Sequence, residues 1–136
     1  MHQTKVQIRF NDIDIVGHVN NAMHQHYYDL ARLSYFNDVF KTRVDWDDES
    51  LVLVHISIDY MNPIFMEDEI FVETKIEKIG NKSISMIQQV CKHAGNEKIV
   101  ASSSSSVLSG FSKKKEISIP IPDLWRKRIY EFENLD

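Results

Sequence analysis

The sequence NDIDIVGHVNNAMHQHYYDLARLSYF, residues 11 to 36, joins a polar cluster to a long apolar segment. Residues 11 to 26 alone contain two acidic residues, a glycine, three histidines and an Asn-Asn pair. The start of a buried helix needs one capping side chain rather than a cluster of polar groups. The excess of polar side chains therefore predicts a functional site at the start of the helix.

A long helix is predicted from Asn21 to about Phe40, where apolar residues recur at spacings of three and four. The apolar arc covers most of the helix circumference, so we expect the helix to be largely enclosed by other structure. Either Asn20 or Asn21 is well suited to cap its first turn.

Strands surround this helix in the sequence, because apolar and polar residues alternate in five further segments. These segments are residues 4–10, 51–60, 69–79, 83–93 and 98–111. In the first, Val6, Ile8 and Phe10 share one face. An acidic loop precedes the second strand and contains Asp45, Asp47, Asp48 and Glu49, and a short helix is predicted near residues 123–133.

The predicted order is strand, long helix, four strands in a meander and a short helix, which is typical of an α+β domain. An antiparallel sheet curled around the long helix explains the wide apolar arc of that helix better than a flat sheet does. We expect a single domain covering residues 1–136.

Composition narrows the classes of function. The chain has 16 Lys and Arg against 20 Asp and Glu, a formal net charge of −4, which argues against a nucleic-acid partner. The sequence contains no apolar run of membrane-spanning length and no secretory signal, so no membrane association is expected. Cys91 is the single cysteine and cannot form an internal disulfide. An intracellular, cytoplasmic protein is expected.

Two blocks of the sequence resemble a known family. The segment RFNDIDIVGHVNNAMHQHYYDLAR, residues 9–32, is similar to the opening motif of hotdog-fold thioesterases of the 4-hydroxybenzoyl-CoA thioesterase type. The segment HISIDYMNPIFMEDEIFVETKIEKIGNKSISM, residues 55–86, resembles the second and third strands of the same family. The likeness covers most of residues 4–108 and implies a hotdog fold with acyl-CoA thioesterase activity.

The resemblance implies roles for individual residues. Asp14 falls where the family places its catalytic carboxylate, acting as general base or nucleophile. Asn21 falls where a backbone N–H at the helix start faces the thioester oxygen. The substrate-binding residues expected around them are Gly17, His18, Val19, Asn20, His24 and Asp59. At position 24 relatives often carry tyrosine, and Leu30 stands where many have a glutamate.

Elementary chemistry supports this arrangement independently. Thioester hydrolysis develops negative charge on the carbonyl oxygen, which the N–H groups and dipole of a helix N-terminus stabilise. A nearby carboxylate can deprotonate water or attack the carbonyl carbon. Asp12 is the alternative acid, although we expect it to hold the loop. For His18, a contact with Asp14 or substrate and a structural role in the loop are equally compatible with the sequence.

No metal and no cofactor are expected. His24 and His26 lie two residues apart on the helix, so their side chains point in different directions and do not readily share an ion. The expected partner is a small-molecule acyl-CoA, with acyl carrier protein as an alternative carrier of the acyl group. The resemblance also implies pairing of subunits edge to edge, as a homodimer or as a homotetramer built from two dimers.

Two other functions stay open from the sequence. The first is a non-catalytic acyl-CoA-binding or regulatory module on the same fold, since a fold does not determine a function. Binding alone needs no carboxylate beside the thioester, so Asp14 discriminates between the two. The second is an acyl-thioester dehydratase or hydratase, for which His18 or His55 would supply the base.

Overall fold

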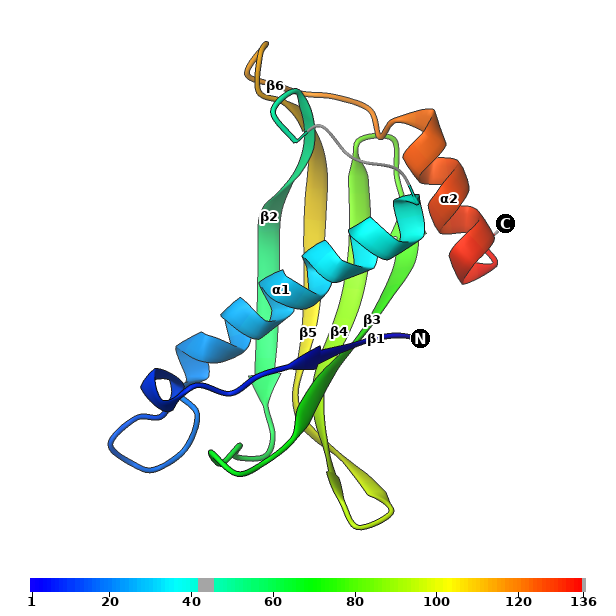
Figure 1. Cartoon of the computed structure of the whole chain (residues 1–136). Coiled ribbons are helices and arrows are strands. Elements are labelled where there is room, and N and C mark those ends of the chain that lie inside the picture. The colour runs from blue at the N-terminus through cyan, green and yellow to red at the C-terminus, as the bar shows by residue number, and fades with distance from the viewer. Residues whose placement is uncertain (42–45, 136) are drawn as a thin grey trace. The chain divides into compact units, whose positions relative to one another are not determined.

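The computed structural model describes residues 1–41 and 46–135, so Asp45 of the predicted acidic loop lies outside the described residues. Its elements are β1 (His2–Val6), the 3-10 helix η1 (Phe10–Asp12), α1 (Asn21–Phe40), β2 (Glu49–Tyr60), β3 (Ile70–Ile79), β4 (Ser83–Ala94), β5 (Glu97–Ser112), β6 (Ile117–Ser118) and α2 (Asp123–Glu133). Figure 1 shows them along the chain. The long helix, the last four predicted strands and the short terminal helix are confirmed within two residues at each end.

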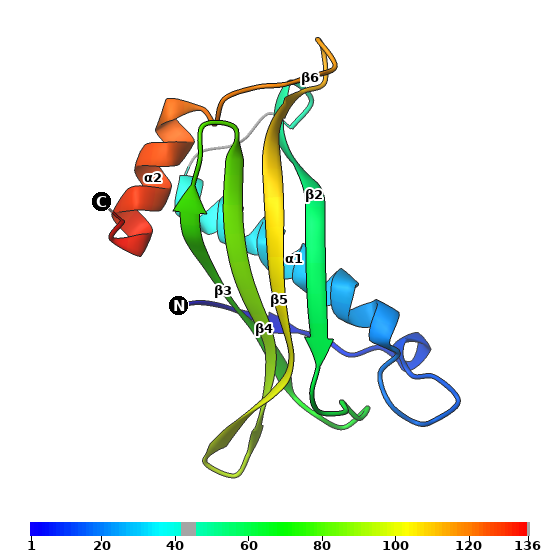
Figure 2. The ribbon, with the colours of Figure 1, turned by 180° about the vertical axis from the view of Figure 1, so that it is seen from behind.

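The strands form one sheet in the order β1-β3-β4-β5-β2, and β6 pairs with β5. Strand β1 runs antiparallel to β3, with Val6 opposite Ile70. The strands β3, β4, β5 and β2 lie side by side in both views (Figures 1 and 2). The α+β class is therefore confirmed.

The predicted meander of four strands is wrong in one respect. Strands β3, β4 and β5 follow one another through tight turns, but β2 lies beside β5 rather than beside β3. Periodicity reports which residues share a face of a strand and carries no information about the neighbouring strand. The connection of residues 61–69 is long enough to place β2 at the far edge of the sheet.

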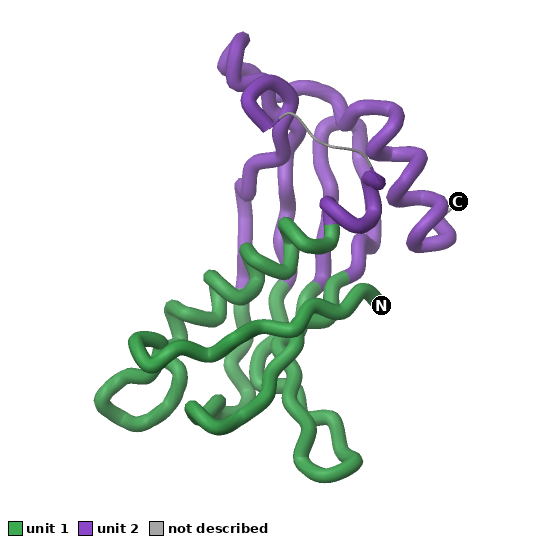
Figure 3. The backbone as a smooth tube through the Cα atoms, viewed as in Figure 1, with its two compact units in different colours: residues 1–35, 58–74, 88–104 green, residues 36–57, 75–87, 105–136 purple. Residues whose placement is uncertain are grey.

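The chain divides into two compact units, coloured separately in Figure 3. Unit 1 comprises residues 1–35, 58–74 and 88–104, and unit 2 comprises residues 36–57, 75–87 and 105–136. The helix α1 and the strands β2 to β5 each contribute residues to both units. The prediction of a single domain over residues 1–136 stays a prediction.

Unit 1 is held together by an apolar cluster between the first part of α1 and the strands. Its buried members are Val6, Ile8, Val19, Tyr27, Tyr28, Ala31, Ile64, Ile70, Val72, Val90 and Ala101. Burial of this apolar surface is the main force that holds a helix on a sheet. The cluster therefore anchors the helix start, where the polar residues of the opening segment lie.

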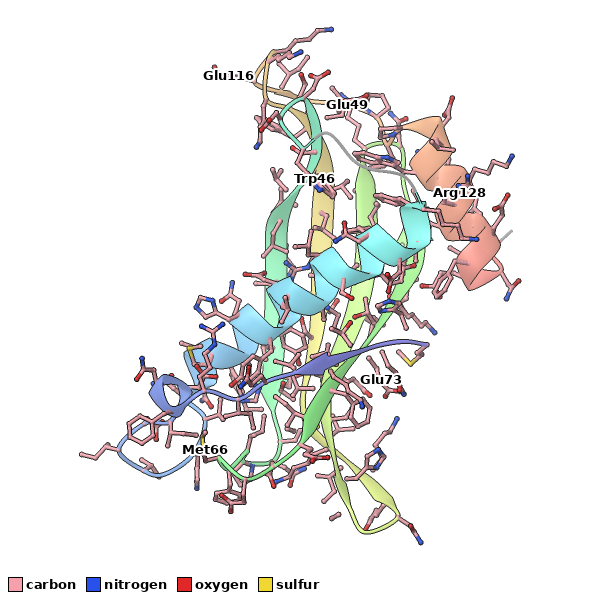
Figure 4. All side chains as sticks on the ribbon, viewed as in Figure 1. Trp46, Glu49, Met66, Glu73, Glu116 and Arg128 are labelled. Carbon is pink, nitrogen blue, oxygen red and sulfur yellow. The ribbon has the colours of Figure 1, made fainter. Side chains whose placement is uncertain are left out.

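Unit 2 contains an aromatic cluster at the end of α1. The ring of Phe40 stacks on Trp125 of α2, with centroids 4.9 Å apart and an interplanar angle of 8°. Trp46, labelled in Figure 4, lies 5.8 Å from Trp125 and 6.5 Å from Phe36, measured between ring centroids. Aromatic pairs at these separations contribute to stability beyond the burial of their large apolar area.

Two further predictions are corrected. The alternation predicts a strand over residues 4–10, but β1 ends at Val6 and the side chain of Phe10 is 82% exposed. The 3-10 turn, closed by the bond from the Asp12 N–H to the Arg9 carbonyl at 2.9 Å, turns Phe10 away from the core. The helix is also less enclosed than predicted, because Leu30 and Leu33 are about half exposed.

Within the described residues, no helix is both long enough and apolar enough to cross a membrane. The cytoplasmic location stays a prediction.

Candidate functional site

The two acidic residues before α1 have different environments. Asp12 is buried, with 3% of its surface exposed. One carboxylate oxygen, Oδ2, accepts the Tyr27 hydroxyl at 2.6 Å and the Arg9 N–H at 3.0 Å. The Asp12 carbonyl accepts the N–H of Asn20 at 2.8 Å. Asp12 therefore holds the loop, as expected from the sequence, and also ties it to α1 through Tyr27.

The bond to Asp12 also affects Tyr27. Burial of the phenol, together with its hydrogen bond to the Asp12 carboxylate and the negative charge there, raises the pKa of Tyr27 above its usual range. Tyr27 stays protonated at neutral pH and keeps donating to Asp12.

Asp14 lies in a tight turn and is only partly buried. Its N–H donates to the carbonyl of His18 at 2.9 Å, and its own carbonyl accepts the N–H of Gly17 at 3.0 Å. Its Oδ1 accepts the Val16 N–H at 2.9 Å. Gly17 has φ of +93°, a conformation that other residues rarely adopt. Within the described residues, Oδ2 of Asp14 has no hydrogen-bond partner, so this oxygen is available to a ligand or to water.

The first turn of α1 is capped by Asn20. The side-chain oxygen of Asn20 accepts the N–H of Ala22 at 2.9 Å, and its carbonyl accepts the N–H of Met23 at 2.9 Å. The sequence left open whether Asn20 or Asn21 caps the helix, and the structure shows that Asn20 does. In the part of the chain that the structure describes, the Asn21 N–H makes no hydrogen bond and is a free donor at the positive end of the helix dipole.

A second loop, residues 61–69, lies against this one. The N–H of Val19 donates to the carbonyl of Ile64 at 2.8 Å, and the ring of His18 meets Phe65 edge to face at 5.1 Å. Met66 of this loop, labelled in Figure 4, is 45% exposed. Lys92 of β4 holds the loop through the Pro63 carbonyl at 2.9 Å and the Asp68 carboxylate at 2.8 Å.

This ion pair explains the acidity of Asp68. Burial alone would raise the pKa of Asp68, but the hydrogen bonds and charge that it receives, chiefly from Lys92, hold its pKa below the usual range. The carboxylate is therefore ionised and engaged in holding the loop.

His24 is buried in the first turns of α1, with 3% of its surface exposed. Its Nδ1 lies 2.8 Å from the hydroxyl of Ser102 on β5, and the Tyr28 hydroxyl lies 2.6 Å from the same serine oxygen. Burial lowers the pKa of His24 to about 4, so its ring is neutral at physiological pH. Substrate contact by His24 stays a prediction.

The predicted site residues gather in unit 1. Asp14, Gly17, His18, Val19 and Asn20 share one loop, and Asn21 and His24 follow on α1. Asp59 lies on β2 with its side chain exposed and no hydrogen bond within the described residues.

No group of three or more His, Cys, Asp or Glu side chains suited to a metal ion occurs among the described residues. That the site needs no metal or cofactor stays a prediction.

Sequence reasoning missed Tyr60 and Ser102. The Tyr60 hydroxyl donates to the carbonyl of Asn21 at 3.0 Å, and its ring lies edge to face with His24 at 5.0 Å. The serine run, residues 102–106, suggests close approach by a ligand or a second sheet, but the group that Ser102 contacts is α1, through His24 and Tyr28. No local signal connects Tyr60 to Asn21, which lies 39 residues earlier.

The sequence is similar to that of known proteins. The model of a family described as the Thioesterase-like superfamily matches residues 8–128. A curated relative, the uncharacterised protein YsmA of Bacillus subtilis strain 168, is 27% identical over 84 residues. That match spans 60% of this chain and 55% of YsmA, so the chain matches only about half of the length of this relative.

Solved structures resemble the chain over nearly its whole length. A thioesterase from Thermus thermophilus, complexed with coenzyme A and Zn, is 30% identical, with a TM-score of 0.83, covering 98% of this chain and 95% of that one. A predicted thioesterase from Bacillus stearothermophilus is 25% identical, with a TM-score of 0.82 and coverages of 95% and 93%. An Asp-to-Asn mutant of 4-hydroxybenzoyl-CoA thioesterase, complexed with 4-hydroxybenzoyl-CoA, is 16% identical, with a TM-score of 0.84 and coverages of 94% and 97%. The hotdog fold is thereby confirmed.

Proposed function

The chain belongs to the thioesterase-like superfamily, and we propose that it is an acyl-CoA thioesterase in which Asp14 acts as general base or nucleophile. The reaction is hydrolysis of an acyl thioester to a carboxylic acid and CoA. The coenzyme A bound by the Thermus thermophilus thioesterase supports CoA as the carrier. Acyl carrier protein is the alternative carrier.

The contrast between Asp12 and Asp14 carries the proposal. Asp12 is buried and bonded to Tyr27 and Arg9, so its carboxylate is committed to the loop. Asp14 is oriented by one bond, from Val16, and keeps Oδ2 open. A general base needs this combination of fixed orientation and an accessible lone pair.

The open N–H of Asn21 supplies the second requirement. During attack on the thioester, the carbonyl oxygen gains negative charge, and a donor at a helix N-terminus stabilises it. The N–H groups of Ala22 and Met23 already donate to Asn20. The N–H of Asn21 is therefore the donor in the first turn that can bind an oxyanion.

Two routes are compatible with these groups. In the first, Asp14 removes a proton from water, the hydroxide adds to the carbonyl carbon, and the C–S bond breaks as the thiolate recovers the proton from Asp14. In the second, the carboxylate of Asp14 itself adds, the thiolate leaves, and water hydrolyses the resulting mixed anhydride. Both routes yield one carboxylic acid and one CoA thiol.

The remaining predicted residues shape the pocket. Gly17 lets the backbone approach the ligand closely, and His18 and Val19 connect its loop to residues 61–69. Asn20 and His24 define the first turn of α1 beneath the thioester. Asp59, exposed near the end of the edge strand β2, is proposed to contact substrate held by a partner subunit.

Pairing of subunits is proposed at β2. This strand ends the sheet, and its outer edge therefore presents N–H and C=O groups that another strand can pair with. Val54 and Tyr60 on β2 are 59% and 45% exposed. We propose that two copies join through β2 as a homodimer, with a dimer of dimers as the alternative.

The decisive experiment measures thiol release from short, medium and long straight-chain acyl-CoAs and from one aromatic acyl-CoA. Wild type is compared with Asp14→Asn, which preserves size and the bond from Val16. Glu97→Gln, on the β4–β5 hairpin, is the matched control for loss of one acidic charge. We expect Asp14→Asn to lower kcat about a hundredfold or more, the effect of losing a general base, and the control to behave as wild type.

Each other outcome rejects a part of the proposal. Equal activity of Asp14→Asn and wild type would show that a different group is the base. Binding of acyl-CoA by the wild type without release of thiol from any substrate would favour the non-catalytic binding module. Conversion of an enoyl-CoA to a hydroxyacyl-CoA with the thioester intact would favour the hydratase.

A further inference from the structure

Tyr60 forms a direct link between the sheet and the first turn of α1. It is the last residue of β2, and its hydroxyl donates to the carbonyl oxygen of Asn21 at 3.0 Å. A carbonyl oxygen has two lone pairs, so it can accept this bond together with the ordinary helical bond from four residues further on. Asn21 is thus held from outside the helix, by a side chain of a different element.

The ring of Tyr60 is held in turn by a buried polar network. His24 lies edge to face with Tyr60, with centroids 5.0 Å apart and an angle of 84° between the rings. The Nδ1 atom of His24 also bonds to Ser102 at 2.8 Å, and Ser102 bonds to the Tyr28 hydroxyl at 2.6 Å. The network is continuous from β5, through α1, to the end of β2.

The N–H groups at the start of α1 differ in whether they have an acceptor. The N–H groups of Ala22 and Met23 are directed by Asn20, and that of Asn20 by Asp12. Among the described residues, the Asn21 N–H has no acceptor, and its direction is set by the peptide plane that it shares with the Asn20 carbonyl, which accepts the Met23 N–H. The Tyr60 bond holds the next plane, that of the Asn21 carbonyl and the Ala22 N–H. A helix terminus frays readily, so holding this second plane as well limits how far the first turn, and with it the Asn21 donor, can move.

We propose that Tyr60 is a positioning residue of the thioesterase reaction, which holds the first turn of α1 so that the Asn21 N–H stays directed at the thioester oxygen. The proposal rests on the function proposed above and assigns no contact between Tyr60 and the reacting atoms. The effect of Tyr60 is exerted through Asn21, and the buried His24–Ser102 pair keeps the Tyr60 ring in place.

A purely structural role for Tyr60 makes a different prediction. Packing between a strand and a helix stabilises the protein whether or not the ligand has a carbonyl oxygen. A positioned oxyanion donor acts only on that oxygen, and more strongly as charge develops on it. The two roles therefore separate when ligands with and without the carbonyl are compared.

The test uses Tyr60→Phe, which removes one hydroxyl and keeps the ring against His24. Tyr130→Phe in α2 is the matched control, because it removes an equal hydroxyl from unit 2. Binding is measured for two acyl-CoA analogues that cannot be hydrolysed. In the ketone analogue a methylene replaces the sulfur and the carbonyl stays, whereas the thioether analogue has no carbonyl oxygen.

For Tyr60→Phe we expect kcat to fall about tenfold to a hundredfold, as for a displaced catalytic donor, with a smaller rise in KM of about fivefold at most, because the bound thioester presents the same uncharged carbonyl as the ketone analogue. Affinity for the ketone analogue should fall about fivefold, the scale of one weakened hydrogen bond. Affinity for the thioether analogue and the unfolding midpoint should stay as in wild type, and Tyr130→Phe should match wild type throughout.

The outcomes distinguish this proposal from the function on which it rests. If wild type cleaves acyl-CoA and Tyr60→Phe has the same kcat and the same affinity for both analogues, the positioning role is overturned and the thioesterase function stands. Equal weakening of both analogues, or a lower unfolding midpoint with unchanged kcat, would assign Tyr60 to packing alone and also overturn it. If wild type cleaves no acyl-CoA, the proposed function itself fails.

A second variant tests the network behind Tyr60. His24→Asn places an amide near the position of Nδ1, so the bond to Ser102 can persist while the ring against Tyr60 is lost. We expect it to reproduce the selective loss of the ketone analogue in weaker form. Unchanged selectivity between the two analogues would remove His24 from the proposal.

Discussion

The two ends of α1 are built on different principles. At its start, in unit 1, side chains bond to backbone groups: Asp12 to Arg9, Asn20 to Ala22 and Tyr60 to Asn21. At its end, in unit 2, the aromatic rings of Phe40 and Trp125 stack at 4.9 Å. Hydrogen bonds are directional and orient particular atoms, whereas aromatic packing contributes stability without orienting a donor. The contrast predicts that changes at the helix end affect folding, and that changes at the helix start affect activity as well.

The largest effect is expected at the helix end. Trp125→Ala removes a buried ring from the stack on Phe40, and loss of such a side chain costs about 3 to 5 kcal/mol of unfolding free energy. Urea unfolding measures this loss, and kcat per folded molecule should stay unchanged. A stable variant with reduced kcat would break the comparison, since it would give the aromatic end a part in the chemistry.

Acid should selectively destabilise the helix start through His24. Its pKa is about 4 in the folded protein, against the ordinary 6.5, so the folded state binds its proton less readily than the unfolded state. Above about pH 6.5, His24 is neutral in both states and does not lower the unfolding free energy. As the pH falls from about 6.5 to about 4, the unfolded state takes up the proton first, so the unfolding free energy decreases by about 3 kcal/mol in all. Urea unfolding at several pH values should show this decline in wild type and a shallower one in His24→Asn; equal slopes would contradict it.

The buried acid at the helix start should matter for folding more than its neighbour does. Asp12→Ala leaves the Tyr27 hydroxyl buried without its acceptor, which costs about 2 kcal/mol of unfolding free energy. Asp14→Ala should cost less than about 1 kcal/mol, because Asp14 is partly exposed and accepts one bond. Addition of Tyr27→Phe to Asp12→Ala should recover part of the loss. Equal destabilisation by the two alanine variants would contradict the division of roles.

The smallest effect is expected at Gly17. A Cβ there would meet nothing within 4 Å, so Gly17→Ala should cost about 1 kcal/mol through its positive φ alone. Gly95→Ala is the matched control, since Gly95 also has positive φ and open space, in the β4–β5 hairpin. Unfolding should respond equally to both, whereas kcat/KM should fall only for Gly17→Ala. Equal kcat/KM values would show that the loop tolerates displacement.

Local sequence patterns predicted the individual elements well. The 3.6-residue period located α1 to its end at Phe40, and Asn20 is a cap of the expected type. Alternation identified β5 in spite of its serine run. These successes share a cause, because periodicity and capping depend on residues only a few positions apart. Phe10 was misplaced because a short turn, closed by Arg9 and Asp12, interrupts the alternation.

The candidate site was predictable where it lies in one continuous motif. The segment from Asp14 to Asn21 contains the carboxylate, the glycine turn and the helix start within eight positions. The groups that hold this segment come from elsewhere: Ile64 for Val19, Tyr60 for Asn21 and Ser102 for His24. No periodic pattern connects residues so far apart, and although Asp12 was expected to hold the loop, its burial was not predicted.

The sequence by itself determined that this chain forms a long helix with a polar start among alternating strands, because those properties follow from neighbouring residues. Only the tertiary structure decided that β2 lies beside β5, that Tyr60 donates to Asn21, and that His24 is buried and neutral. Each of these depends on groups brought together by folding, up to 78 residues apart for His24 and Ser102. A residue becomes buried only after the strands have paired. Its pKa, and whether its hydrogen-bond donors have a partner, are therefore properties of the folded chain.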